Sequence, residues 1–235
     1  MMITIADVVK QYGSITAVDH VNLIFENNTV TALMGENGAG KSTLLKMCTG
    51  ILSLDHGDII IDGHSIQTHP VQAKQELGYL PEMPYMYDRL TGREFLLYIA
   101  SLREIHDAHA LIDEYVQRLG MQQFLDYEIG TYSKGMKQKI SIITALMHQP
   151  ANLLLDEPVW GLDPLTSRTL QDFIAKRKGT TVVATHSPDL VEHVANVVYV
   201  MKQGRILHSG HVPKLIKDYG SIEDMYFAVG DKKSC

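Results

Sequence analysis

The sequence predicts an α/β fold with one core and an inserted helical segment. Apolar, β-branched runs of strand length stand at residues 30–34, 153–155, 181–184 and 196–201. Between the first two, from about residue 81 to 150, apolar residues instead recur at helical spacing. A chain of 235 residues, 45% of them apolar, is long enough for one domain with a buried core. We therefore expect the strands before and after the helical segment to belong to one sheet.

The N-terminal part predicts an antiparallel β-subdomain. Residues 1 to about 32 have the pattern of short strands, with turn signals at Tyr12-Gly13 and Asn27-Asn28. The apolar run 59–61 is followed by Asp62-Gly63, a pair typical of a tight hairpin turn.

A glycine-rich loop lies between a strand and a helix. The segment Gly35–Thr43, G-E-N-G-A-G-K-S-T, fits the pattern G-x-x-x-x-G-K-[ST] and precedes a helical run, 42–49, that ends at Gly50. Such glycines let successive N–H groups point at an anion, and the helix N-terminus adds a partial positive charge. Lys41 can then reach phosphate oxygens, and Ser42 can offer a hydroxyl to Mg²⁺. A chance glycine turn is the alternative, and the flanking elements argue against it. The residues expected to hold a nucleotide here are Gly35, Asn37, Gly38, Gly40, Lys41, Ser42 and Thr43.

A carboxylate pair closes the apolar run 153–155. Asp156 is expected at the carboxyl end of that strand, where open α/β sheets bind ligands, and can hold Mg²⁺ directly or through water. Glu157 follows it and points in a different direction. A solvated strand end is the usual explanation of an isolated Asp-Glu, but here the glycine loop is also present.

Further motifs follow in fixed order: Y-S-K-G-M-K-Q-K at Tyr132–Lys139, N-L-L-L-D-E-P at Asn152–Pro158, G-L-D-P at Gly161–Pro164 and T-H-S at Thr185–Ser187. Together with the glycine loop they resemble the ATP-binding-cassette (ABC) ATPases, in which two copies close on two ATP molecules. The resemblance spans Tyr12 to about Gly210. It implies a RecA-like P-loop NTPase core at about 1–80 and 150–215, with the antiparallel β-subdomain, a helical subdomain inserted at about 81–149 and a short C-terminal tail at 216–235.

The resemblance implies a role in trans for the second motif, whose common family form is L-S-G-G-Q. Ser133 and Gly135 are kept, and they would contact the γ-phosphate of the ATP held by the partner. Lys134 and Met136 depart from the common form. Ser133 is also a good helix N-cap, and both roles are compatible because a helix N-terminus attracts phosphate.

Other residues take their roles from the same resemblance. Glu157 would be the general base that polarises the attacking water, and His186 the switch histidine that contacts the γ-phosphate. Tyr12 would stack on adenine, although a lone tyrosine is more often a packing residue. Glu82 stands where the family usually has glutamine; a carboxylate cannot donate a hydrogen bond to water, but it can face Mg²⁺. Asp163 belongs to the loop that meets the partner subunit.

The function expected from the resemblance is that of an ATP-hydrolysing subunit of an ABC transporter, most like bacterial exporters. It would pair with a second copy or a paralogous ATPase and sit on the cytoplasmic face of the cell membrane, through permease subunits encoded elsewhere. The stretch Pro81–Glu94 lies where the family forms the groove for its membrane partner. Its apolar residues are Met83, Tyr85, Met86 and Tyr87, whose alternative role is packing of the inserted lobe.

Composition limits the alternatives. A net charge of −6 argues against nucleic acid as a partner. No run approaches the ~18 apolar residues of a membrane span, and the N-terminus lacks the pattern of a signal peptide. Cys48 and Cys235 give no disulfide framework, and Lys176-Arg-Lys178 has the pattern of a solvated helix end. A soluble ABC ATPase, such as one of iron–sulfur assembly, remains an alternative, whereas the second motif and Gly161–Pro164 argue against a P-loop kinase.

Overall fold

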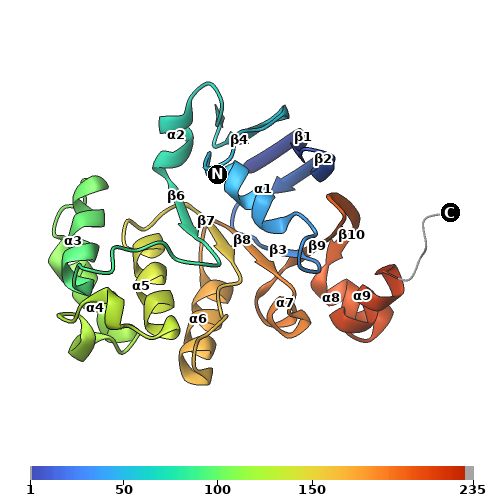
Figure 1. The fold of residues 1–235 in the computed structure, drawn as a ribbon. Helices are drawn as coiled ribbons and strands as arrows, with labels where there is room; N and C mark the ends of the chain where they lie inside the picture. Colours follow the sequence, from blue (N-terminus) through green and yellow to red (C-terminus); the bar gives the residue numbers. More distant parts are fainter. Residues whose placement is uncertain (1, 231–235) are drawn as a thin grey trace.

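The computed structural model describes residues 2–230, which form two sheets with helices between and below them (Figure 1). The antiparallel sheet has the strand order β2-β1-β4-β5, with β1 (Ile3–Tyr12), β2 (Ile15–Phe25), β4 (His56–Ile61) and β5 (His64–Ser65). The turns expected at Gly13, Asn28 and Asp62-Gly63 are confirmed, since these residues have the positive φ that tight turns require.

The expectation of short N-terminal strands is wrong, because β1 and β2 have 10 and 11 residues. Their pairing is interrupted by register shifts, and Asp7 in β1 and His20 in β2 have φ near +50°. Such irregularities bend a strand and increase its twist, which lets two long strands curve over the layer beneath.

The second sheet has the order β10-β9-β3-β8-β7-β6. Its parallel strands are β3 (Val30–Met34), β6 (Leu77–Leu80), β7 (Asn152–Asp156), β8 (Thr180–Thr185) and β9 (Val197–Lys202), and β10 (Arg205–His211) runs antiparallel at one edge. Every residue of β3, β7 and β8 is buried, which explains why the sequence shows unbroken apolar runs there instead of alternation. Met34 is paired with Thr185, and Asp156 with Ala184. The carboxyl ends of the central strands therefore meet at one edge.

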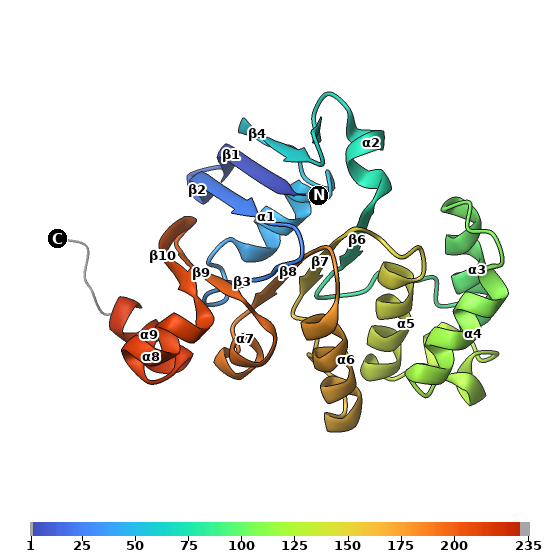
Figure 2. The ribbon, with the colours of Figure 1, turned by 180° about the vertical axis from the view of Figure 1, so that it is seen from behind.

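Helix α1 (Lys41–Cys48) lies between the two sheets, and five further helices lie on or beside the opposite face of the parallel sheet (Figures 1 and 2). Those on or beside that face are α5 (Lys134–Leu146), α6 (Pro164–Lys176), α7 (Pro188–Val194), α8 (Val212–Tyr219) and α9 (Ile222–Gly230). The helical segment at one end of the molecule adds α3 (Gly92–Leu102) and α4 (Ala108–Arg118), with 3₁₀ turns at Gln122–Phe124 and Ile129–Thr131. The short α2 (Pro70–Gln75) links β5 to β6.

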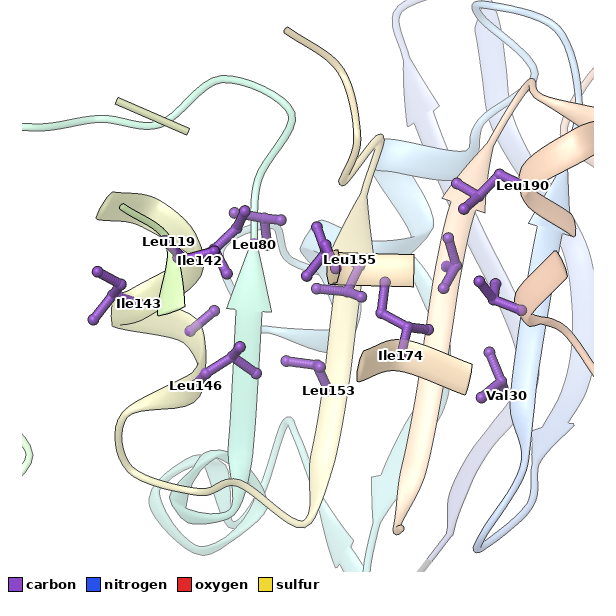
Figure 3. Packing of buried hydrophobic residues seen from close by; sticks show 14 of the residues in the cluster. Val30, Leu80, Leu119, Ile142, Ile143, Leu146, Leu153, Leu155, Ile174 and Leu190 are labelled. Atoms are coloured by element: carbon purple, nitrogen blue, oxygen red, sulfur yellow. The ribbon is translucent and has the colours of Figure 1, made fainter. Parts of the chain in front are cut away.

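Most of α3–α9 shares one apolar core with the lower face of the parallel sheet. In Figure 3 the side chains of Ile142 and Leu146 in α5 lie beside Leu80 and Leu153 of the sheet. Burying a leucine or isoleucine stabilises the fold by about 1.5–3 kcal/mol. Since this cluster continues to Leu119 after α4, the helical segment is packed onto the sheet through α5. A second cluster, which includes Cys48, fills the space between α1 and the two sheets.

One surface expectation is corrected by the structure. Lys176 and Lys178 are exposed, but Arg177 is half-buried, and its guanidinium donates to the carbonyl oxygens of Thr180 and Pro150. The side chain of Arg177 thus links the loop between α6 and β8 to the segment just before β7. Cys235 and residues 231–235 of the expected tail lie outside the described residues. No helix within residues 2–230 is both long and apolar enough to cross a membrane.

Candidate functional site

The glycine loop is fixed between strands of both sheets. Gly40 is the N-cap of α1 with φ of +105°, and a Cβ there would collide with the carbonyl of Ala17 in β2 and lie 2.8 Å from Met201 Cε in β9. A Cβ on Gly35 would collide with the carbonyl of Met201. The turn after β9 adds a hydrogen bond to the loop, because Gly204 N–H donates to Ala39 O (3.0 Å). Glycine is therefore required by close backbone approach at both ends of the loop.

A cavity of about 530 Å³ lies against this loop and gathers most of the expected nucleotide-binding residues. Its lining residues are Tyr12, Ala17, Asn37, Gly38, Gly40, Lys41, Ser42, Thr43, Glu82 and Glu157. Tyr12, although 47% exposed, is at the cavity as expected for a residue that could stack on a base. Ala17 was missed by the sequence analysis, because only the folded curve of β2 brings it to the loop.

Lys41 is buried and holds the loop in shape. Its Nζ donates to the carbonyl oxygens of Gly35 (2.7 Å) and Glu36 (3.0 Å). Burial lowers the pKa of Lys41, and the nearby carboxylates of Glu157, Asp156 and Glu82 oppose that effect. The ammonium group is thus placed at the cavity with partners that phosphate oxygens could replace.

Asp156 is at the end of β7, 1% exposed, and within residues 2–230 neither of its carboxylate oxygens has a hydrogen-bond partner. Burial raises the pKa of Asp156 to about 6; the Ser42 hydroxyl opposes the rise, but its geometry falls short of a hydrogen bond. Buried carboxylates are normally paired or bind a metal ion. The orphaned oxygens, with a hydroxyl beside them, therefore fit a hard divalent cation such as Mg²⁺.

Glu157 is oriented by the end of the neighbouring strand β8. It has φ of +47° and lies in the cavity wall. Its Oε2 accepts from the Thr185 hydroxyl (3.0 Å), and its Oε1 accepts from the His186 backbone N–H (3.0 Å) and lies 2.7 Å from His186 Nδ1. The structure thus brings Glu157 and His186 together. Thr185 was missed as a functional residue, and the signal was its place in the T-H-S motif.

The Tyr132–Lys139 motif lies elsewhere in the same copy. Ser133 is the N-cap of α5 and accepts from Met136 N (3.2 Å), as the sequence predicts. A Cβ on Gly135 would lie 2.7 Å from Gly161 O, and the Lys134 ammonium sits over the Trp160 ring. Of the described residues that line the cavity, none comes from this motif. The motif therefore packs against the Gly161–Pro164 loop, and in residues 2–230 it does not line the phosphate cavity of its own copy.

The fold and the cavity together define a P-loop nucleotide hydrolase: a parallel sheet whose carboxyl edge carries a glycine loop, a buried aspartate and an oriented glutamate. The chain belongs to the ABC transporter family, whose model, described as "ABC transporter", matches residues 18–160.

Curated relatives agree with this assignment. The chain is 33% identical to the ABC transporter ATP-binding protein NatA of Bacillus subtilis (strain 168), over 96% of each chain. It is also 33% identical to the bacitracin transport ATP-binding protein BcrA of Bacillus licheniformis, over 93% of this chain and 73% of BcrA.

Two solved structures show the same fold. A structure titled "Structure of ATP binding subunit of ABC transporter" has a TM-score of 0.90, with 25% identity over 98% of this chain and 100% of the other. The ATP-binding cassette MJ0796, dimeric in a post-hydrolysis state with ADP and Pi, has a TM-score of 0.80, with 21% identity over 89% of this chain and 98% of that chain.

The protein is thus the ATP-binding, ATP-hydrolysing subunit of an ABC transporter. These relatives do not favour the alternative of a soluble ATPase of iron–sulfur assembly.

Proposed function

We propose that two copies of this chain, or this chain and a paralogous ATPase, close on two ATP molecules with Mg²⁺ and thereby drive permease subunits. The observation that carries this proposal is the separation of the Tyr132–Lys139 motif from the described lining of the phosphate cavity. The N-terminus of α5, which presents Ser133 and Gly135, is an arrangement that attracts phosphate, yet within residues 2–230 it does not line the phosphate cavity of its own copy. A second copy would bring that helix to the open side of the cavity.

Asp156 and Ser42 would hold Mg²⁺ in this proposal, with Glu82 facing it from the cavity rim. Mg²⁺ would neutralise charge that develops on the transferred phosphoryl group. The support is the buried and unpartnered carboxylate of Asp156.

Other residues of this chain would bind the phosphates and the base and would activate the attacking water. The Lys41 ammonium would leave the Gly35 and Glu36 carbonyls for phosphate oxygens, and Tyr12 would stack on the base. Glu157 would accept a proton from the attacking water, while His186 fixes the direction of that carboxylate and faces the γ-phosphate.

The membrane partner would dock at Pro81–Glu94, and the subunit would then lie at the cytoplasmic face of the membrane. In this stretch Met83, Tyr85 and Tyr87 are 63%, 89% and 59% exposed. Met86 instead packs against the core, so the packing alternative holds for that residue. Three large exposed side chains within five residues favour a binding surface.

A mixing experiment tests the shared site. Ser133→Arg should abolish ATP hydrolysis while the isolated monomer still binds ATP, because the phosphate cavity is untouched. Mixing it with Lys41→Ala chains leaves one intact composite site and one doubly broken site in each heterodimer. Part of the hydrolysis should therefore return.

One outcome would contradict the shared site. Loss of ATP binding by the Ser133→Arg monomer would mean that the motif acts within one copy. A thermal unfolding midpoint equal to that of the wild type serves as the control for folding of each variant.

A further inference from the structure

The motif Y-S-K-G-M-K-Q-K carries three lysines, and one of them has no carboxylate partner. Lys137 Nζ lies 2.9 Å from Asp88 Oδ1, and Lys139 Nζ lies 3.3 Å from Asp163 Oδ2. Lys134 is exposed, and within residues 2–230 it forms no ion pair. Of the lysines in this motif, Lys134 is therefore the one whose charge is left for an anion from outside the copy.

The ammonium group of Lys134 instead lies over the ring of Trp160 in the same copy. The stem of the lysine runs against Gly161, where an added Cβ would lie 3.7 Å from both Cγ and Cδ of Lys134. The tryptophan is 40% exposed. A cation–π contact at an exposed site favours the bound cation by only about 2–5-fold. The ring therefore holds the lysine weakly, and a stronger partner can displace it.

Lys134 is also the first residue of α5, between Ser133 and Gly135. In the proposed function these two residues face the γ-phosphate of the ATP held by the partner. Rotation about the side-chain bonds of Lys134 is enough to turn its ammonium from the ring toward that helix N-terminus. A charge-assisted hydrogen bond to phosphate favours the bound state by about 10–150-fold, which is more than the ring contact. The common family form has glycine at this position, so the family resemblance supplies neither the cation nor its contact with the ring.

We infer that Lys134 is a switching cation of the shared site. It lies over Trp160 of its own copy while the partner's site is empty, and it binds the γ-phosphate oxygens of the partner's ATP when the two copies close. The inference rests on the proposed shared site and adds a residue and a switch to it. The ring contact opposes closure weakly, and the γ-phosphate overcomes it. ADP lacks that phosphate, so the lysine returns to the ring after hydrolysis.

The experiment measures the dimer that the full chain forms with Mg²⁺-ATP, in a Glu157→Gln parent that keeps ATP intact. Analytical ultracentrifugation gives the dimer dissociation constant. Lys134→Met removes the charge but keeps the length of the side chain, and it should weaken the dimer roughly tenfold or more. Trp160→Leu removes the competing ring and should strengthen the dimer by about 5–30-fold, because each dimer frees two lysines. Trp160→Phe should lie between Trp160→Leu and the parent, because phenylalanine attracts a cation less than tryptophan does.

The opposite signs of the two effects separate this switch from a purely structural contact. If Lys134 and Trp160 only packed together, removing either side chain would weaken the dimer. The matched control is Lys214→Met, an exposed lysine on α8, which should leave the dissociation constant unchanged. Every variant should bind ATP as a monomer with the affinity of the parent, and equal thermal unfolding midpoints show that the variants are folded.

A second measurement uses the fluorescence of Trp160, the one tryptophan of the chain. Without nucleotide, the emission spectrum of Lys134→Met should differ from that of the parent, because the cation no longer lies over the ring. Equal spectra would overturn the inference. So would a Trp160→Leu protein whose dimer is no stronger than that of the parent, or a Lys134→Met protein whose dimer is no weaker. If the parent itself forms no dimer with ATP, the proposed shared site fails, and that failure is recognised because it does not depend on Lys134 or Trp160.

Discussion

Glu157→Gln should separate ATP binding from hydrolysis, because the substitution changes one functional group and little else. In the structure Oε1 of Glu157 accepts from the His186 N–H and lies against His186 Nδ1, and the glutamine carbonyl can keep this arrangement. At Oε2 an amide would replace the acceptor of the Thr185 hydroxyl. That hydroxyl already accepts from Ser187 N (3.1 Å) and has a second lone pair for the amide. The folding cost is therefore about one hydrogen bond, ~1 kcal/mol.

The effect of Glu157→Gln on the activation barrier for hydrolysis is larger than its effect on folding. Glutamine cannot take a proton from water, and a positioned general base contributes ~10²–10⁴-fold. The activation barrier should then rise by about 2.7–5.4 kcal/mol, at 1.36 kcal/mol per tenfold. The variant should still bind ATP, and the dimer closed on ATP should persist because hydrolysis does not open it.

Phosphate release under single-turnover conditions measures the loss of hydrolysis. Size-exclusion chromatography with Mg²⁺-ATP measures whether the dimer closed on ATP persists. Glu223→Gln, an exposed glutamate on α9, is the matched control and should behave as the wild type. A Glu157→Gln protein that hydrolyses ATP within tenfold of the wild-type rate would refute the assignment of the base. So would a monomeric elution volume despite bound ATP.

Three further outcomes are expected. Lys41→Ala should weaken ATP binding by roughly 10–100-fold or more in calorimetry, since a charge-assisted hydrogen bond contributes ~1.5–3 kcal/mol; unchanged affinity would contradict the phosphate site. Because the pKa of His148 is about 4 in the folded protein and about 6.5 unfolded, the unfolded state takes up a proton first as pH falls. His148 thus contributes stability above pH ~6.5 that is lost towards pH ~4, and His148→Gln should flatten this acid limb in urea unfolding; equal limbs would disprove the burial argument. A Cβ on Gly78 would overlap Ala145 O and Pro150 Cγ, so Gly78→Ala should lower stability by about 1–3 kcal/mol in thermal unfolding. Gly230→Ala, with open space around it, should not; equal effects of the two would argue against overpacking.

The phosphate loop could be predicted because its information is local. Strand, glycines, lysine and helix are contiguous from Val30 to Gly50, and the backbone geometry follows from that order. The placement of Asp156 could be predicted for the same reason, since it ends an apolar run.

Other parts of the site depend on contacts between distant segments and could not be predicted. The bond from Thr185 to Glu157 exists because β7 and β8 pair in register. The phosphate cavity likewise takes Ala17 from β2 and Glu82 from the segment after β6, and no single window of sequence shows that they meet. The length of β1 and β2 was underestimated, and the positive φ and register shifts at Asp7 and His20, which let two long strands bend, give no signal in the sequence pattern.

The phosphate loop is also one of the places where the two sheets contact each other. Gly40 touches the β2 backbone, Gly35 touches the β9 backbone, and the turn at Gly204 hydrogen-bonds both Ala39 and Asp19. A ligand that binds only the folded loop stabilises the native state by mass action. Because that loop connects both layers, separating the layers would also dismantle the nucleotide cavity. Bound nucleotide should therefore oppose unfolding of the whole domain, so that the same ligand that is turned over also lengthens the time the chain stays folded.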